Sequence, residues 1–253
     1  MAIDIADKMA FMFDAVDMKA QADFARAIAK QYRESFRKNL IDFDTMTVHG
    51  ECQTCQAMAV FYNMFTEDEK PQAFARLLDF IKVFDGHMDC GVLGARVIFH
   101  VLSDFGYTDL ALNMITRPDF PSYGYIVELG LNTLWEKFTR EPMESINHHF
   151  WGDITAWFVK VLVGIDYNPD ATDLTRVDIK PHIAENLNDA TAYYDSNYGK
   201  IEVSWKKSGN TATLTVNVPE NMSGIIAPQN NYRFADGDTQ KLLASGEYIL
   251  TKV

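Results

Sequence analysis

At 253 residues and 47% hydrophobic content, the chain is long enough to bury the core of one large domain, or of a large and a small one. Its 35 acidic and 23 basic residues give a formal charge of -12, which repels polyphosphate backbones and anionic lipid surfaces, so we expect neither nucleic acid nor a membrane as a partner. The apolar stretches are too short to cross a bilayer, the N-terminal residues are too charged for a signal peptide, and three cysteines suit a reducing compartment, which together predict a cytoplasmic protein.

The chain from its start to about Ile165 has the apolar spacing of helices, as Phe24, Ile28 and Tyr32 illustrate. Thr66 and Glu69 form a capping-box signature that predicts the start of a helix running to about residue 84. The pattern predicts further helices at about residues 4–14, 18–39, 52–64, 92–105, 108–116, 131–139 and 150–163. Because no strand pattern separates these helices, we expect residues 1–165 to form an all-α array such as a toroid or a solenoid.

The periodicity changes to strand-like alternation after Gly164. Apolar residues alternate with polar ones over Ile201–Trp205 and Ala212–Val218, and Ser208-Gly209-Asn210 between them is typical of a hairpin turn. Residues 166–253 are therefore predicted to form a small antiparallel β-sandwich. Its other strand-like runs are Val177–Ile179, Ala190–Tyr194, Ser223–Ala227 and Glu247–Thr251.

Acidic, aromatic and histidine residues gather between residues 121 and 152. Glycosidases use two carboxyl groups, one that protonates the leaving oxygen and one that activates water or attacks carbon. In the stretches 121–137 and 145–152, where these residue types are densest, Glu128 and Glu136 are the available pair of carboxylates. Their side chains lie roughly 80° apart around an uninterrupted helix, and Gly130 disfavours such a helix. The alternative interpretation is that both are solvated surface glutamates.

Five short motifs occur in the order and approximate spacing of the α-L-rhamnosidases, glycoside hydrolase family 78. These are Gln53-Thr54-Cys55-Gln56-Ala57, His87-Met88-Asp89-Cys90-Gly91, Pro121-Ser122-Tyr123-Gly124-Tyr125, Thr133-Leu134-Trp135-Glu136 and Asn147-His148. Three more resemble the C-terminal sandwich of that family: Ile179-Lys180-Pro181, Tyr198-Gly199-Lys200-Ile201 and Val203-Ser204-Trp205. The resemblance covers nearly the whole chain, and its weight comes from the joint order of the motifs.

The resemblance implies a catalytic (α/α)6 toroid and an inverting mechanism without metal or cofactor, in which water attacks the anomeric carbon of a terminal α-L-rhamnosyl unit. It gives Glu136 the role of general base and leaves Glu128 as a reserve candidate. Tyr123 stands where the family often has tryptophan, and Asp89 adds a charge that can alter sugar preference. The residues expected to bind a rhamnose-containing glycoside or oligosaccharide are His87, Asp89, Tyr123, Tyr125, Trp135 and His148.

The chain departs from the family in two respects. The family's general acid lies in an earlier acidic motif that this sequence does not contain, and a toroid of twelve helices exceeds the eight or so predicted here. The chain is then a fragment of a longer enzyme, one half of an assembly whose other half is a partner chain, or a reduced relative with another task. Missing helices leave an apolar edge, so we expect association with a second copy or with a complementary chain.

Other interpretations stay open. A non-catalytic carbohydrate-binding or assembly subunit would keep the aromatic residues without a general acid, and a related toroid enzyme would cleave another sugar. Cys52 and Cys55 have CxxC spacing, but no second pair follows, which favours two ordinary thiols. His148 and His149 point about 100° apart on a helix and cannot both face one metal, so we expect no metal site.

Overall fold

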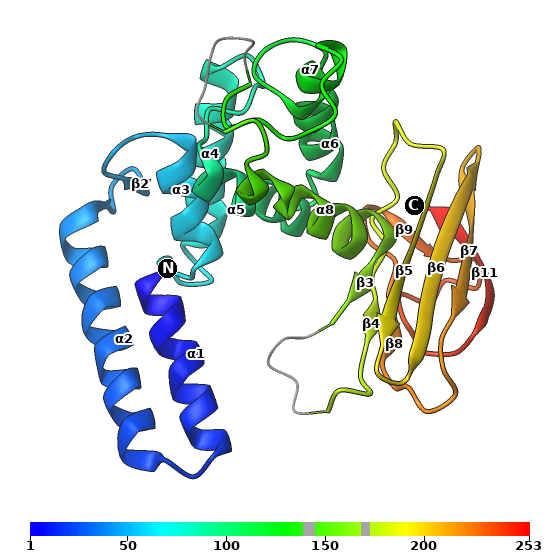
Figure 1. The fold of residues 1–253 in the computed structure, drawn as a ribbon, viewed down its shortest axis with the longest axis horizontal. Coiled ribbons are helices and arrows are strands. Elements are labelled where there is room, and N and C mark those ends of the chain that lie inside the picture. The colour runs from blue at the N-terminus through cyan, green and yellow to red at the C-terminus, as the bar shows by residue number, and fades with distance from the viewer. Residues whose placement is uncertain (139–144, 168–172) are drawn as a thin grey trace. The chain divides into compact units, whose positions relative to one another are not determined.

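The computed structural model describes residues 1–138, 145–167 and 173–253 (Figure 1). Its chain divides into two compact units, Met1–Val101 and Leu102–Val253. This division differs from the boundary at residue 165 that the sequence suggests, which stays a prediction. Among the described residues, no helix combines the length and the apolar character that a membrane span requires.

The first unit begins with a helical hairpin of α1 (Ala2–Ala15) and α2 (Lys19–Leu40). Alanines let the two helices approach closely, because Ala6 and Ala10 of α1 and Ala22, Ala25 and Ala29 of α2 are buried. A small hairpin of β1 (Ile41–Asp42) and β2 (Thr47–Val48) follows, so the expectation of helices without strands between them is wrong at this point. Strands of two residues are too short to produce a readable alternation.

Three more helices follow in the first unit, as predicted: α3 (Gln53–Phe61), α4 (Lys70–Val83) and the start of α5 (Val92–Asp104). The capping-box signature before α4 is confirmed in its carboxylate half, because the Thr66 backbone N–H donates to Glu69 Oε2 at 2.8 Å. Pro71 lies in the first turn of α4, where its missing N–H costs no helical hydrogen bond.

The helical part of the second unit contains α6 (Thr108–Thr116) and α7 (Tyr123–Glu128), and then a continuous helical path formed by η1 (His149–Asp153), α8 (Ile154–Trp157) and η2 (Phe158–Val163). The predicted helix at 131–139 is wrong over the described residues 131–138, which form bends, and residue 139 lies outside the described residues. α7 ends at Glu128, and Gly130 turns the chain with a φ of +70°, so Glu128 and Glu136 do not share a helix.

The C-terminal strands form two sheets. The predicted hairpin is confirmed, with Gly209 in its turn at a φ of +58°. The five-stranded sheet is antiparallel and has the order β5 (Asp189–Ser196), β6 (Gly199–Ser208), β7 (Thr211–Asn217), β11 (Gly246–Lys252) and β9 (Tyr232–Phe234). The four-stranded sheet has the order β10 (Lys241–Leu242), β8 (Ile225–Ile226), β4 (Asp178–Ile179) and β3 (Ile165–Asp166). It departs from the antiparallel prediction, because β4 and β8 run parallel.

Both sheets contribute to one apolar core. Val203 and Trp205 of the five-stranded sheet and Ile179 and Ile226 of the four-stranded sheet are almost completely buried within it. The Trp205 indole N–H donates to the Leu162 carbonyl at 2.7 Å, which satisfies the indole inside the core and ties the sheet to the end of η2. A helical region followed by a β-sandwich is therefore confirmed as the architecture of the chain.

Candidate functional site

The segment that carries Glu136 is held by backbone hydrogen bonds to the segment that carries His148. The Glu136 N–H donates to the Ser145 carbonyl at 3.0 Å, and the His148 N–H donates to the Leu134 carbonyl at 2.6 Å. Both side chains are half-buried. The structure thus brings the predicted general base and a predicted sugar-binding histidine onto adjacent stretches of chain.

Three buried rings support this segment from beneath. Tyr123, Phe138 and Trp151 pack on one another with centroid distances between 4.7 and 6.1 Å. The Tyr123 hydroxyl donates to the Trp151 carbonyl at 3.1 Å, and the Trp151 indole N–H lies 3.3 Å from the Glu136 carbonyl, to which it donates. The Tyr123 ring is therefore engaged mainly in packing, and Trp151 fixes the main chain of Glu136.

A groove of about 570 Å³ lies against α7 in the second unit. Glu128 and Tyr123 are the predicted site residues that line it, and the exposed Glu128 carboxylate stands at the end of α7. Asn132 and Thr133 add polar groups to the wall. The remaining lining side chains are largely apolar: Ile115, Ile126, Val127, Leu131, Leu134, Ile154 and Phe158. Apolar walls with a few polar groups suit a small ligand that has one apolar face.

The other predicted residues of the second unit lie outside the lining of this groove. Tyr125 is half-buried, with its ring 5.8 Å from that of Phe120 in an edge-to-face contact. Trp135 is half-buried, and the His148 ring lies 5.5 Å from that of Phe150. The groove accordingly unites Glu128 and Tyr123, whereas the backbone pairing described above unites Glu136 and His148.

His87 and Asp89 belong to the first unit, in the connection between α4 and α5. His87 is half-buried, with Nδ1 3.1 Å from the Phe84 carbonyl, and Asp89 is exposed. The side-chain amide of Gln53 bonds to the backbone at both residues, donating to the His87 carbonyl and accepting from the Asp89 N–H, each at 2.9 Å. The predicted sugar-binding residues of this unit are thus fixed by a side chain from the start of α3.

Gln53 in the first unit and Trp151 in the second each hold the main chain of a predicted site residue, and the sequence alone does not single them out. Gln53 was visible as part of a family-like motif, and Trp151 as one of several aromatics. Their polar groups are nearly or fully buried and must find partners, but which backbone groups they meet depends on the fold.

The three cysteines are free, and burial makes Cys55 and Cys90 poor nucleophiles and metal ligands. Burial raises the pKa of Cys55 to about 11 and that of Cys90 to about 12, so both thiols are neutral at pH 7. Within residues 1–138, 145–167 and 173–253, no group of three or more His, Cys, Asp or Glu side chains is placed to hold a metal ion.

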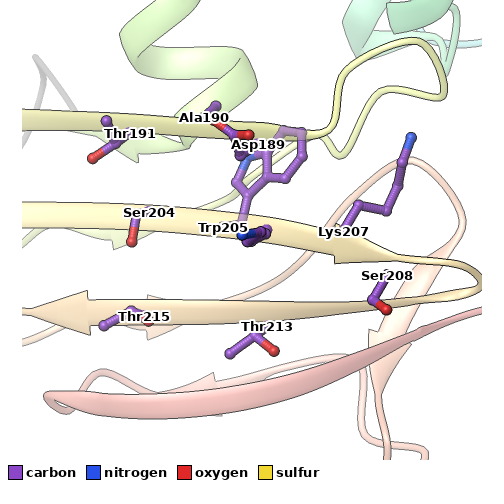
Figure 2. A pocket seen from close by; sticks show the side chains of 10 residues that line it. Asp189, Ala190, Thr191, Ser204, Trp205, Lys207, Ser208, Thr213 and Thr215 are labelled. Carbon is purple, nitrogen blue, oxygen red and sulfur yellow. The ribbon is translucent and has the colours of Figure 1, made fainter.

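A second hollow, of about 720 Å³, lies on the five-stranded sheet and contains none of the predicted residues. Figure 2 shows Thr191, Ser204, Thr213 and Thr215 on its three adjacent strands, β5, β6 and β7. The alternation of the strands places these hydroxyls on the face opposite to the core, where Trp205 is buried.

Comparison with known proteins covers both parts of the chain. Residues 1–162 match the family described as bacterial alpha-L-rhamnosidase 6 hairpin glycosidase domain, and residues 164–239 match the bacterial alpha-L-rhamnosidase C-terminal domain. A curated alpha-L-rhamnosidase of Alteromonas sp. (strain LOR) is 27% identical over 213 residues, which are 80% of this chain and 23% of that protein. One from Streptomyces avermitilis is 28% identical over 188 residues, 71% of this chain and 18% of that protein.

Two solved structures share the fold. The alpha-L-rhamnosidase from Dictyoglumus thermophilum superposes with a TM-score of 0.85 at 24% identity and covers 99% of this chain and 31% of its own. The alpha-L-rhamnosidase of Streptomyces avermitilis complexed with L-rhamnose also gives 0.85 at 24% identity, covering 98% and 26%. The chain spans about a quarter of the length of the curated relatives it matches. Since the six-hairpin description matches well over half of its residues, the chain belongs to the bacterial alpha-L-rhamnosidase family.

Proposed function

We propose that this chain takes part in the hydrolysis of terminal α-L-rhamnosyl residues, with inversion at the anomeric carbon and with Glu136 as the general base. Family membership supports the reaction class. The observation that carries the assignment is the backbone pairing of the Glu136 segment with the His148 segment, which places a half-buried glutamate and a half-buried histidine on adjacent stretches of chain.

Inverting hydrolysis requires an ionised carboxylate about one water molecule away from the sugar. Glu136 accepts a proton from that water as it attacks the anomeric carbon, and a separate acid protonates the leaving oxygen. The Trp151 indole and the Ser145 carbonyl hold the Glu136 main chain, so less freedom is lost when the transition state forms.

Rhamnose carries a methyl group where most hexoses carry a hydroxymethyl group. This methyl group fits apolar and aromatic surroundings. Trp135 supplies the aromatic surface in this proposal, Tyr123 packs behind it as part of the buried ring cluster, and His148 donates to a hydroxyl. Sugar binding by His87 and Asp89 concerns the first unit and stays a prediction from the sequence.

The test is release of nitrophenol from a nitrophenyl α-L-rhamnoside by the full chain. Glu136→Gln should lower kcat by about 10²- to 10⁴-fold, the usual value of a positioned general base. Glu128→Gln is the matched control, since it removes an exposed carboxylate of the same segment, and it should retain activity within a few-fold. Activity that survives Glu136→Gln and falls with Glu128→Gln would reverse the two roles.

A non-catalytic carbohydrate-binding subunit is the second candidate, favoured by the groove against α7, whose largely apolar lining suits a sugar and contains Glu128 as its single carboxylate among the described residues. Titration with L-rhamnose separates the two. Binding without any release of nitrophenol supports the subunit, and binding with release supports the enzyme.

A further inference from the structure

The groove of about 570 Å³ against α7 is separate from the place where the proposed function puts the sugar. Neither Glu136 nor His148 is among the described residues that line it. Its volume is within the usual range of small-molecule pockets, about 300 to 1,000 Å³. Because the rhamnosyl unit binds beside Glu136 on the proposed function, the groove is left for another part of the substrate.

Two lining residues of the groove belong to the segment that leads to Glu136. The Thr133 hydroxyl donates to the Ile146 carbonyl at 2.5 Å, and the Leu134 carbonyl accepts from the His148 N–H at 2.6 Å. Two residues of extended chain span at most about 7 Å, so the Cα atoms of Leu134 and Glu136 lie no farther apart than this. The wall of the groove therefore comes within about one sugar ring of the Glu136 main chain.

The lining of the groove favours a flat apolar group. Val127 on α7 is 71% exposed and Phe158 at the start of η2 is 37% exposed, so a ligand in the groove would remove apolar surface of both from water. The hydroxyls of Thr116 and Thr133 already donate to main-chain carbonyls. An apolar group therefore gains more from this lining than a ring of hydroxyls does.

We propose that this groove binds the aglycone, the group that leaves when the glycosidic bond is cleaved, and that it selects an aromatic or other flat apolar aglycone. The inference rests on the proposed function, because that function places the sugar at Glu136 and His148. Val127 and Phe158 are then specificity-determining residues that contact the leaving group and not the sugar. Contacts that are equally strong in the ground state and the transition state lower KM for aryl rhamnosides and leave kcat nearly unchanged.

The experiment titrates the full chain with two rhamnosides that resist hydrolysis and differ only in the aglycone, 4-nitrophenyl and methyl 1-thio-α-L-rhamnoside. The native chain should bind the nitrophenyl compound about tenfold more tightly, because its ring buries apolar surface in the groove. Val127→Asp adds a charge that the ring would have to desolvate, so this difference should fall to within about twofold. Affinity for the methyl compound should stay within about twofold of native, which also shows that the variant is folded.

Val83→Asp is the matched control, because Val83 is 79% exposed and ends α4 in the first unit. Gly86 stands three residues after Val83 with a φ of +74°, and Gly130 stands three residues after Val127 with a φ of +70°. Both variants thus place a carboxylate near the C-terminus of a helix, with a similar effect on stability. Val83→Asp should keep the tenfold difference between the two glycosides.

The outcomes separate the proposed function from the aglycone site. A native chain that binds neither glycoside refutes both. A native chain that binds the two glycosides equally refutes only the aglycone site, as does a Val127→Asp variant that keeps the tenfold difference. If Val127→Asp loses affinity for both glycosides while Val83→Asp keeps it, the groove holds the sugar itself, and the assignment to the aglycone is overturned.

Discussion

The Glu69 carboxylate accepts hydrogen bonds from two parts of the chain. Arg37 forks onto it, with Nη1 2.8 Å from Oε2 and Nη2 2.9 Å from Oε1, and the Thr66 N–H adds a third bond at 2.8 Å. Arg37 contributes most to lowering the pKa of Glu69 from its ordinary 4.5 to about 2. One side chain thereby caps α4 and ties it to α2.

Replacing Glu69 by Gln should lower the free energy of unfolding by about 2 kcal/mol at pH 7, because it breaks a forked, partly buried ion pair. The lowered pKa means that this contribution is complete above pH 4.5 and is lost as the pH falls towards 2, so the native and variant unfolding curves should converge over that window. Urea unfolding at a series of pH values measures it.

Glu67→Gln is the control for this change. Glu67 pairs with Lys70 but its side chain is 85% exposed, so its removal should cost less than about 0.5 kcal/mol at any pH. If Glu67→Gln lowered the free energy of unfolding as much as Glu69→Gln, the change in net charge, and not the loss of the forked ion pair, would be responsible.

The residues of the candidate site were only partly accessible from the sequence. Glu136 and His148 stand out in the sequence because carboxylates and imidazoles are common catalytic groups. In the structure, backbone hydrogen bonds join the segments that carry them. The contributions of Gln53 and Trp151 were not accessible, because their partners are main-chain groups 34 and 15 positions away, which carry no signature in the amino-acid type.

Among the secondary-structure elements, the helix predicted from apolar spacing was wrong where hydrogen bonds to a neighbouring segment determine the structure. Leu131, Leu134 and Phe138 are spaced as on a helix, yet the chain there pairs with residues 145–148, and the Thr133 hydroxyl donates to the Ile146 carbonyl at 2.5 Å. α7 had a readable start in the Ser122 cap, whose side chain accepts from the Tyr125 N–H at 2.9 Å. α7 was not among the helices that the apolar spacing predicts.

The outer face of α1 gives the prediction that belongs to this scale. An apolar row with helical spacing is exposed along it, formed by Ile5, Met9, Met12 and Val16 at 45 to 64% exposure. We expect this row to support association with a second copy, and Met9→Lys with Met12→Lys should shift the chain towards monomer in sedimentation velocity. The control is Lys30→Ser with Glu34→Ser, a double change at exposed positions of α2 that should leave the association unchanged. A monomer at every concentration contradicts the expectation.

For the whole molecule, the change of period after Gly164 was enough to predict helices followed by a sandwich. The short strands β3, β8 and β10 could not be bounded in this way, since two residues hold no period. Long-range pairing was equally hidden: β3 completes the four-stranded sheet through Ile165 and Ile179, and the Trp205 indole bonds to Leu162. The last helical residues are thus part of the sandwich core.

A fragment of residues 158–253 should therefore be markedly more stable than one of residues 166–253. The shorter fragment lacks Ile165 and the acceptor of the Trp205 indole, which leaves a buried N–H unpaired and should cost at least about 2 kcal/mol. Circular dichroism melting of the two fragments compares them. Equal melting temperatures would mean that the residues before 166 do not stabilise the sandwich, in agreement with the predicted boundary at residue 165.

The parallel pairing of β4 with β8 also fixes an order of events during synthesis. Ile179 acquires its neighbour Ile226 only after β5, β6 and β7 have left the ribosome, whereas those three strands pair with neighbours in sequence. Until β8 arrives, β4 keeps an open edge on which a strand of another nascent chain can dock. Before residue 226 emerges, this edge of β4 is therefore open to pairing with the wrong strand.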